Sequence, residues 1–401
     1  MADTTKKVEE VEVDYTIANP NTLAKYKDAA TIAHKVLAEV IKAATPGTTI
    51  LSLCQKGDEL LEEETGKVYK GKKISKGIAF PTTISPNDIL TPYTPIPSEA
   101  AEAAITIHEG DVLKIQLGAQ IDGMPAIVGD TIVVGGASKP EQADLLLATH
   151  YVTEALLRYL IPAAAHPSNT EEKPYKAPSA AAINQTLAKI AATYGCKLVD
   201  STTTFTLDRN EIESKKRLVL NPGENVQKSE GASEINDVWG VEVAVTRGSG
   251  KVKEMKDKRA TLFKKNDAKY QLKRQSSRQT FNEIQKKFGT FPFSLRQLQD
   301  ERSAKMGVLE CVRGNVLRQF EVLGDKDGEI CSRIYITAAA TKNGIVKLAA
   351  PEPLDVEKVK SDKKIEDQEI LDLLAIPLAQ DPKKKKKAKK AAAPAAAETK
   401  A

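Results

Sequence analysis

Two stretches near the start of the chain repeat apolar residues at the spacing of an α-helix. Asn19-Pro20-Asn21-Thr22 offers a capping side chain and a helix-starting proline, and apolar residues then recur every three or four positions. Pro46-Gly47 predicts the end of this helix, and a second one is expected from Thr49 into the acidic run at 58–64. The polar residues 1–15 show no such period, which predicts disorder.

From Gly77 to Gly136 the pattern changes to short strands and turns. Residues 112–118 alternate apolar and polar side chains, which predicts a strand with one inward and one outward face. Asp122-Gly123 is a hairpin signal, and residues 131–134 predict the following strand. Further helices are predicted at about 140–161, 179–194, 276–305 (interrupted by Phe291-Pro292-Phe293) and 365–377, and further strands near 218–220, 240–246, 320–323 and 330–338.

The two halves of the chain resemble each other weakly. Each has a helix pair, a break rich in Gly and Pro, and then a strand pair, which predicts an internally duplicated α+β domain. We expect this domain over 16–364, a short terminal helix over 365–377, and a disordered lysine-rich tail over 378–401. No run of about 18 apolar residues exists, so no membrane span or membrane partner is predicted.

The cysteines and the N-terminus indicate a reducing compartment. The first residues lack the apolar core of a secretory signal. The four cysteines form no CxxC pair, so they are predicted to be buried thiols rather than zinc ligands: Cys54, Cys196, Cys311 and Cys331.

The net charge of +5 hides a strong asymmetry along the chain. Residues 383–401 contain eight Lys and one Glu, and residues 247–278 contain twelve basic and three acidic residues. These two segments carry +7 and +9, so the remainder of the chain carries −11. Such clustering is typical of a polyanion-binding protein, with a merely solubilising surface as the alternative.

Four segments carry a resemblance to a known family. Phe80–Ser85 with Thr91–Pro95 resembles the approach to the catalytic histidine of type-2 methionine aminopeptidases, and Gly110–Gly118 resembles the strand with their first metal-binding aspartate. Phe291–Arg296 and Lys305–Cys311 resemble the proliferation-associated, ErbB-receptor-binding proteins of animals and the curved-DNA-binding proteins of fungi. The resemblance covers most of the chain, and the lysine tail also fits.

This resemblance implies the pita-bread fold of creatinase and methionine aminopeptidase, with two pseudo-symmetric α+β halves around a central pocket. Active members hold two metal ions there on five carboxylate or histidine ligands, because two adjacent divalent cations need several anionic oxygens. In this sequence Pro92 stands at the catalytic histidine position, and only Glu242 of the five ligands is retained. The other four positions carry Gln116, Ile127, Tyr335 and, within a residue or two, Phe205.

We therefore expect no catalytic residue, no metal and no cofactor. The four histidines of the chain stand at none of the matching positions, and no GxSxG, P-loop, GxGxxG or HExxH motif occurs. A binding protein is favoured over an enzyme.

The basic segment 247–278 is the main candidate for contact with nucleic acid, and the resemblance implies an insert that projects from the fold. Its aromatic residues Phe263 and Tyr270 are expected to anchor it to the body more than to stack on bases. Its three acidic residues are too few to neutralise its cations. The predicted phosphate contacts are Arg247, Lys251, Lys253, Lys256, Lys258, Arg259, Lys264, Lys265, Lys269, Lys273, Arg274 and Arg278.

The tail offers a second, less specific candidate, either a nuclear or nucleolar targeting signal or a tether to nucleic acid. The lysines predicted to make this contact are Lys383, Lys384, Lys385, Lys386, Lys387, Lys389 and Lys390.

The resemblance implies binding to ribosomes, ribosomal RNA or curved DNA, with a role in ribosome biogenesis or translation control in the cytoplasm and the nucleus or nucleolus. Shape and phosphate contacts would carry this binding. Two alternatives stay open. One is an adaptor or transcriptional coregulator that binds proteins through the acidic body or the terminal helix, where residues 370–374 resemble an LxxLL variant. The other is a residual metallo-aminopeptidase.

Overall fold

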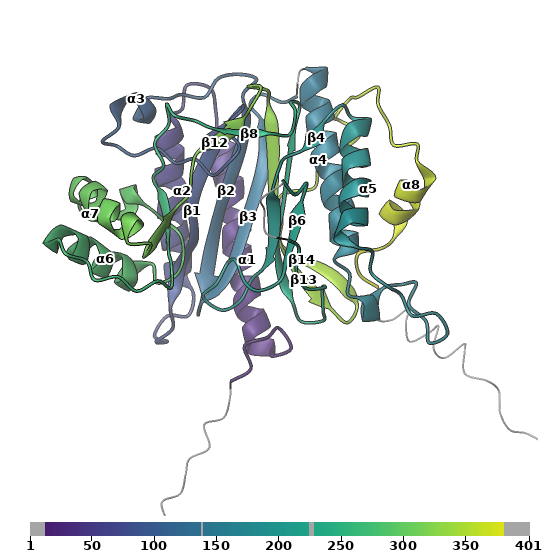
Figure 1. The fold of residues 1–401 in the computed structure, drawn as a ribbon, viewed down its shortest axis with the longest axis horizontal. Coiled ribbons are helices and arrows are strands. Elements are labelled where there is room, and N and C mark those ends of the chain that lie inside the picture. The colour runs from purple at the N-terminus through teal and green to yellow at the C-terminus, as the bar shows by residue number, and fades with distance from the viewer. Residues whose placement is uncertain (1–12, 138, 224–227, 381–401) are drawn as a thin grey trace, which may run out of the picture.

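The computed structural model describes residues 13–137, 139–223 and 228–380. A nine-stranded sheet runs through it in the order β1-β2-β3-β13-β7-β5-β6, with β14 paired to β13 and β4 paired to β7. Figure 1 shows α1 and α2 beside the first half of this sheet and α4 and α5 beside the second half. The predicted α+β architecture with two similar halves is therefore present.

The first half contains the predicted helix pair and strand pair, with its helices starting where the capping residues stand. The side chain of Asn19 accepts from the backbone N–H of Asn21, and the hydroxyl of Thr49 accepts from that of Ser52. The elements are α1 (Pro20–Ala43), α2 (Ile50–Lys67), β1 (Lys76–Pro86), the one-turn α3 (Ala100–Ala103), β2 (Val112–Ile121) and β3 (Met124–Val133).

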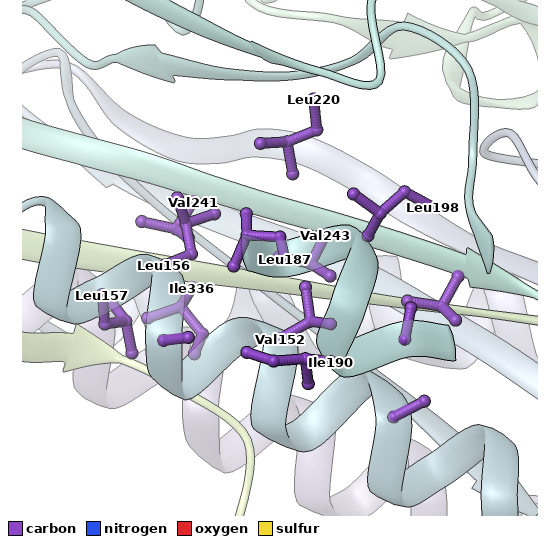
Figure 2. Close-up of a cluster of buried hydrophobic side chains, with 14 of the residues drawn as sticks. Val152, Leu156, Leu157, Leu187, Ile190, Leu198, Leu220, Val241, Val243 and Ile336 are labelled. Carbon is purple, nitrogen blue, oxygen red and sulfur yellow. The ribbon is translucent and has the colours of Figure 1, made fainter. Parts of the chain in front are cut away.

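The second half repeats this plan. Its elements are α4 (Pro140–Tyr159), the 3-10 turn η1 (Ala163–Ala165), α5 (Ala180–Thr193), β4 (Lys197–Leu198), β5 (Thr202–Thr206), β6 (Arg217–Leu220), β7 (Val238–Thr246), β13 (Cys331–Thr341) and β14 (Gly344–Ala349). Figure 2 shows side chains from α4, α5 and β7 gathered into one apolar cluster, among them Val152, Leu187 and Val241. The terminal helix α8 (Gln368–Ala375) lies within the predicted range and packs on α4.

Between β7 and β13 the chain forms a smaller layer, whose helices α6 and α7 lie beside the first half in Figure 1. It contains β8 (Val252–Glu254), β9 (Leu262–Lys265), α6 (Gln275–Lys287), β10 (Phe293–Ser294), the 3-10 turn η2 (Leu295–Gln297), α7 (Glu301–Arg313), β11 (Leu317–Gln319) and β12 (Leu323–Asp325). The strand predicted near 320–323 is only partly present, because residues 320–322 connect β11 to β12 and only Leu323 belongs to a strand. A buried ion pair joins this layer to α2: Arg296 Nη2 lies 2.6 Å from Asp58 Oδ2.

The prediction that β2 has one inward and one outward face is wrong. All ten of its residues are buried, including the polar Lys114, Gln116 and Gln120. Helices α1 and α2 contact β2, while Gln116 faces a cavity on the sheet. Lys114 is tolerated because its Nζ donates to the carbonyl oxygen of Asn87 at 2.5 Å.

The structure also tests the predictions made for the N-terminal residues, for the four cysteines and for membrane-spanning helices. Residues 1–12 lie outside the described part of the chain, but the ring of Tyr15 packs under the guanidinium of Arg209 at 4.1 Å, so the predicted disorder does not extend to residue 15. All four cysteines are buried free thiols, as predicted. Within the described ranges, no helix has the length and hydropathy that a membrane span requires.

The two halves of the sheet meet where β13 lies between β3 and β7. The ladder between β13 and β7 extends over nine residue pairs, but β13 and β3 share only the pair Tyr335 and Gly129. Threonine hydroxyls replace the missing ladder. Thr337 Oγ1 accepts from the N–H of Ile127 and donates to its carbonyl, at 2.9 and 2.8 Å. Thr131 Oγ1 makes the same two bonds with Arg333, at 2.8 and 2.7 Å.

We predict that Thr337→Val destabilises the protein although the two side chains have the same shape. The change leaves the N–H and the carbonyl of Ile127 buried without partners, which should cost about 1–3 kcal/mol of unfolding free energy. Urea denaturation followed by circular dichroism measures this loss. Thr203→Val is the matched control, because the Thr203 hydroxyl reaches only the carbonyl of Ser201 in a half-buried strand. Equal stability of the two variants would contradict the hydroxyl-bridged seam.

Candidate functional site: a central cavity and a basic surface

A cavity of about 630 Å³ opens on the face of the sheet opposite α1 and α4, over the seam between the halves. It is lined by all six positions that the resemblance assigns to catalysis and metal binding: Pro92, Gln116, Ile127, Phe205, Glu242 and Tyr335. These residues come from the first and second halves and from the loop after β1. The structure thus brings the six positions together around one cavity.

Three of these side chains form a row across neighbouring strands. Gln116 pairs in register with Gly129, Gly129 with Tyr335, and Tyr335 with Glu242. Residues in register across a sheet project from the same face. The row therefore crosses the seam, with Gly129 as its one position without a side chain.

Tyr335 covers the floor of the cavity. Its ring lies across Gly240, where a Cβ atom would collide with the phenol oxygen, and its Cβ atom lies close to Gly129. Burial raises the pKa of the Tyr335 phenol well above its ordinary value, so the group stays neutral. A neutral ring thus stands at the position that the resemblance assigns to the fifth ligand, and it requires glycine at position 240 and leaves little room for a side chain at position 129.

Arg333 is a cavity residue that the sequence reading missed. It lies two residues before Tyr335 on β13, its side chain is 3% exposed, and its Nη1 lies 4.0 Å from Glu242 Oε1. Burial lowers the pKa of Arg333 and raises that of Glu242, while each charge favours the other. The alternation of β13 could have indicated it, since residues two apart share a face.

The polar atoms of the cavity do not match a two-metal site. Gln116 Oε1 and Arg333 Nη2 are buried with no hydrogen-bond partner among the described residues. Glu213, a further acid of the lining, is already paired with Arg318 at 2.6 Å. The described ranges contain no group of three His, Cys, Asp or Glu arranged to hold a metal ion. A buried guanidinium beside Glu242 would also repel a dication.

The basic segment is not a single projecting insert, as had been expected. Its β9 is the middle strand of a three-stranded sheet between β10 and β11, and β8 pairs with β12. Phe263 on β9 is buried against Phe293, which confirms that it anchors the segment, whereas Tyr270 is 45% exposed.

Several of the predicted phosphate contacts already have acidic partners, most of them from distant parts of the chain. Lys264 is only 7% exposed and donates to Glu211 at 2.5 Å, so it is not available on the surface. Arg259 pairs with Glu99 at 2.8 Å, Lys258 with Asp257 at 2.7 Å, and Arg247 lies 3.7 Å from Asp144. Counting only the acids within the segment therefore overestimated its free positive charge.

The exposed cations of the segment that have no ion pair in the described structure form two groups. The β8 group is Lys251, Lys253 and Lys256. The α6 group, just before and within α6, is Lys269, Lys273, Arg274 and Arg278. Lys265 is half-buried, also without an ion pair among the described residues. The predicted tail contacts from Lys383 to Lys390 lie outside the described residues.

The chain is similar in sequence and in fold to several known proteins. A model of the metallopeptidase family M24 matches residues 24–172. The curved DNA-binding protein of Schizosaccharomyces pombe is 39% identical over 389 residues, which is 95% of this chain and 97% of that protein. The ERBB-3 binding protein 1 of Solanum tuberosum is 34% identical over 375 residues, covering 92% of this chain and 90% of that protein. The solved structure of a thermophilic Arx1 is 52% identical with a TM-score of 0.87, covering 90% of this chain and 100% of that one. Together these similarities confirm the predicted pita-bread fold.

We predict that Glu242 and Arg333 are energetically coupled. Glu242→Gln leaves a buried guanidinium without an acid, and Arg333→Met leaves a carboxylate without a cation, so each should cost roughly 1–3 kcal/mol of unfolding free energy. The double variant should recover part of the loss, because a neutral pair leaves no uncompensated charge. Urea denaturation of all four proteins gives the coupling energy.

The exposed pair of Glu63 and Lys67, 2.7 Å apart, provides the control cycle. Its coupling should stay below about 0.5 kcal/mol, because solvent screens it. Additive losses for Glu242 and Arg333 would show that the two charges do not compensate each other.

Proposed function

The chain belongs to the family of curved DNA-binding, ErbB-receptor-binding and proliferation-associated proteins, and on this premise we propose that it is a non-enzymatic protein that binds ribosomal RNA or other structured nucleic acid. The observation that carries the proposal is the pair of exposed cation groups on an otherwise acidic body. Seven exposed cations that form no ion pair among the described residues repel one another, and a polyanion would neutralise them.

The central cavity supports the non-enzymatic part of the proposal. A hydrolytic two-metal site must bind both ions and activate a water between them. Pro92 offers no titratable group for proton transfer, Ile127 has no lone pair, and the Tyr335 phenol is neutral. Of the six positions, only Glu242 carries a carboxylate, and the guanidinium of Arg333 lies beside it.

The cations of the β8 and α6 groups are suited to binding phosphate groups without recognising the base sequence. Three of the seven cations are lysines of the β8 group, which neutralise phosphate as point charges. Two of the α6 group are arginines, which can bridge phosphate oxygens. A curved DNA and a folded ribosomal RNA present the same phosphate groups, so we propose both as ligands. We propose the ribosome as the main partner, and ribosome biogenesis or translation control as the role of the protein. The lysine tail would add affinity and direct the protein to the nucleus and nucleolus.

A protein contact beside the α6 group is a second candidate function. On α7, Met306 is 53% exposed and Leu309 44% exposed, an unusual pair of apolar side chains on a surface helix. The terminal helix is less suited to this role. Ile370 of α8 is buried and Leu373 and Leu374 pack against the core, so the residues of its LxxLL-like sequence face the body.

We predict that the protein has no aminopeptidase activity. Turnover of a Met-Ala-Ser peptide should not exceed that of a heat-killed sample, and added cobalt or manganese should not create it, because the ligand side chains themselves are absent. An active methionine aminopeptidase in the same assay is the positive control. Elemental analysis finding two tightly bound metal ions per chain would refute the prediction independently of turnover.

We predict that charge reversal in the α6 group weakens nucleic-acid binding electrostatically. Each phosphate contact contributes roughly 0.7–0.9 to the slope of log K against log salt, so Lys269→Glu, Lys273→Glu and Arg274→Glu together should reduce the slope by about 2–3. Fluorescence anisotropy with an RNA hairpin and a curved DNA duplex measures both slopes, and ribosome co-sedimentation tests the main partner. The triple variant of the β8 group, at Lys251, Lys253 and Lys256, tests that group in the same way.

The matched control reverses three exposed lysines on and before α5, namely Lys173, Lys176 and Lys189, so the net charge change is identical. This control should retain most of the affinity and the salt slope. Equal losses in the control and the α6 variant would indicate a general effect of net charge, and unchanged binding of both triple variants would leave the tail as the contact.

A further inference from the structure

A second cavity lies on the opposite face of the sheet from the central cavity. Successive residues of β13 point to opposite faces, so Arg333 and Tyr335 line the central cavity while Ile334 and Ile336 line this rear cavity of about 450 Å³. Asp130 of β3 lines the rear cavity beside them.

The rear cavity is closed by α4 and by the segment that follows β14, residues 350–359. His34 of α1 holds this segment in place. Its Nδ1 lies 3.0 Å from the carbonyl oxygen of Ala350, and its Nε2 lies 3.1 Å from Glu352 Oε1. The apolar part of the lining comes chiefly from Leu146, Ile334, Ile336, Leu354 and Val359.

Three of the four acids that line this cavity have a basic side chain as a partner. Glu154 pairs with Lys347 at 2.5 Å and with Arg158 at 2.8 Å. Glu352 pairs with His34, and Asp355 pairs with Lys358 at 2.8 Å. Of the four, Asp130 is the exception.

Asp130 has no cation within ion-pair distance anywhere in the described ranges, and its carboxylate accepts a hydrogen bond from the N–H of Thr131 at 2.8 Å. The other titratable side chains facing the cavity do not compensate it. Lys347 already forms an ion pair with Glu154. Burial lowers the pKa of His150, which keeps that ring neutral at pH 7.

The pKa of the Asp130 carboxyl reflects its burial without a cation partner. Burial raises the pKa of its carboxyl from 3.8 to about 7, and only the hydrogen bond from Thr131 opposes that rise. A carboxyl in such surroundings is stabilised as an anion by any cation that enters without bringing water.

We propose that the rear cavity is a binding site for a small apolar amine, whose ammonium group pairs with Asp130 and whose hydrocarbon body packs between Ile334, Ile336 and Leu354. The charge of the ligand follows from the single uncompensated acid, and its apolar body follows from the walls. The volume is within the range of sites for small molecules. This inference does not depend on nucleic-acid binding, which uses other residues on other elements.

Isothermal titration calorimetry of the full chain with cyclohexylamine, and with cyclohexanol as the uncharged analogue, tests the proposal. A charge-assisted hydrogen bond in a buried site should make the amine bind roughly ten- to hundredfold more tightly than the alcohol. In Asp130→Asn this preference should disappear while the alcohol binds as before. Asp355→Asn is the matched control, because it removes an acid of the same lining that already has a partner, and it should keep the preference.

Proton release gives a second readout that does not depend on a variant folding. Because burial raises the pKa of the Asp130 carboxyl to about 7, a bound ammonium should displace a fraction of a proton from it near neutral pH, and this fraction should fall as the pH rises above that pKa. Titrations in phosphate and Tris, which differ in ionisation enthalpy, measure this number.

Three results would overturn the proposal. The first is equal affinity of the wild-type protein for cyclohexylamine and cyclohexanol, including no binding of either. The second is unchanged amine binding in Asp130→Asn. The third is binding of spermidine, which has no compact apolar body, as tightly as cyclohexylamine, since that would indicate attraction to surface charge.

Discussion

The architecture depends on how β13 satisfies its backbone on both edges. Toward β7 it does so with a regular ladder, but toward β3 only one residue pair is in register, and two threonine hydroxyls supply the remaining bonds. A hydroxyl can donate and accept at once, so one threonine side chain can satisfy both backbone groups of a facing residue where the ladder does not. The two cavities lie on opposite faces of the sheet at this junction, since Arg333 and Tyr335 line one of them and Ile334 and Ile336 line the other.

The charges that line the central cavity differ from those of a two-metal site. Several anionic side chains close together are stable only when metal ions compensate them, because buried like charges repel strongly. In this chain Glu242 lies beside the buried Arg333, Glu213 is paired with Arg318, and a neutral tyrosine ring occupies the floor. These two acids of the cavity therefore have cations of the protein itself beside them.

Sequence reasoning succeeded where the determinants are local. The starts of α1 and α2 could be read from Asn19 and Thr49, because a capping side chain acts within three residues of itself. The position of the central cavity could be read from the family resemblance of short motifs. The burial of Lys114 could not, because it depends on Asn87, Cys331 and Arg333, which reach it from other parts of the chain. The ion pair between Lys264 and Glu211 joins residues 53 positions apart, so a count of charges within one segment could not find it. The role of Arg333 was missed for the same reason, since its acid is on another strand.

The strand order also determines when the protein can complete its fold during synthesis. β13 is central in the sheet, yet it begins at Cys331, after more than three quarters of the chain has been made. Until then β3 and β7 each present an open edge of unpaired N–H and carbonyl groups, and such edges are templates for wrong pairing. Closure also requires contacts between residues about 200 positions apart, such as Thr131 with Arg333, and contacts of that range form slowly. A nascent chain that stalls before residue 331 is thus two half-sheets with exposed inner edges, and its solubility at that stage depends on whatever covers those edges.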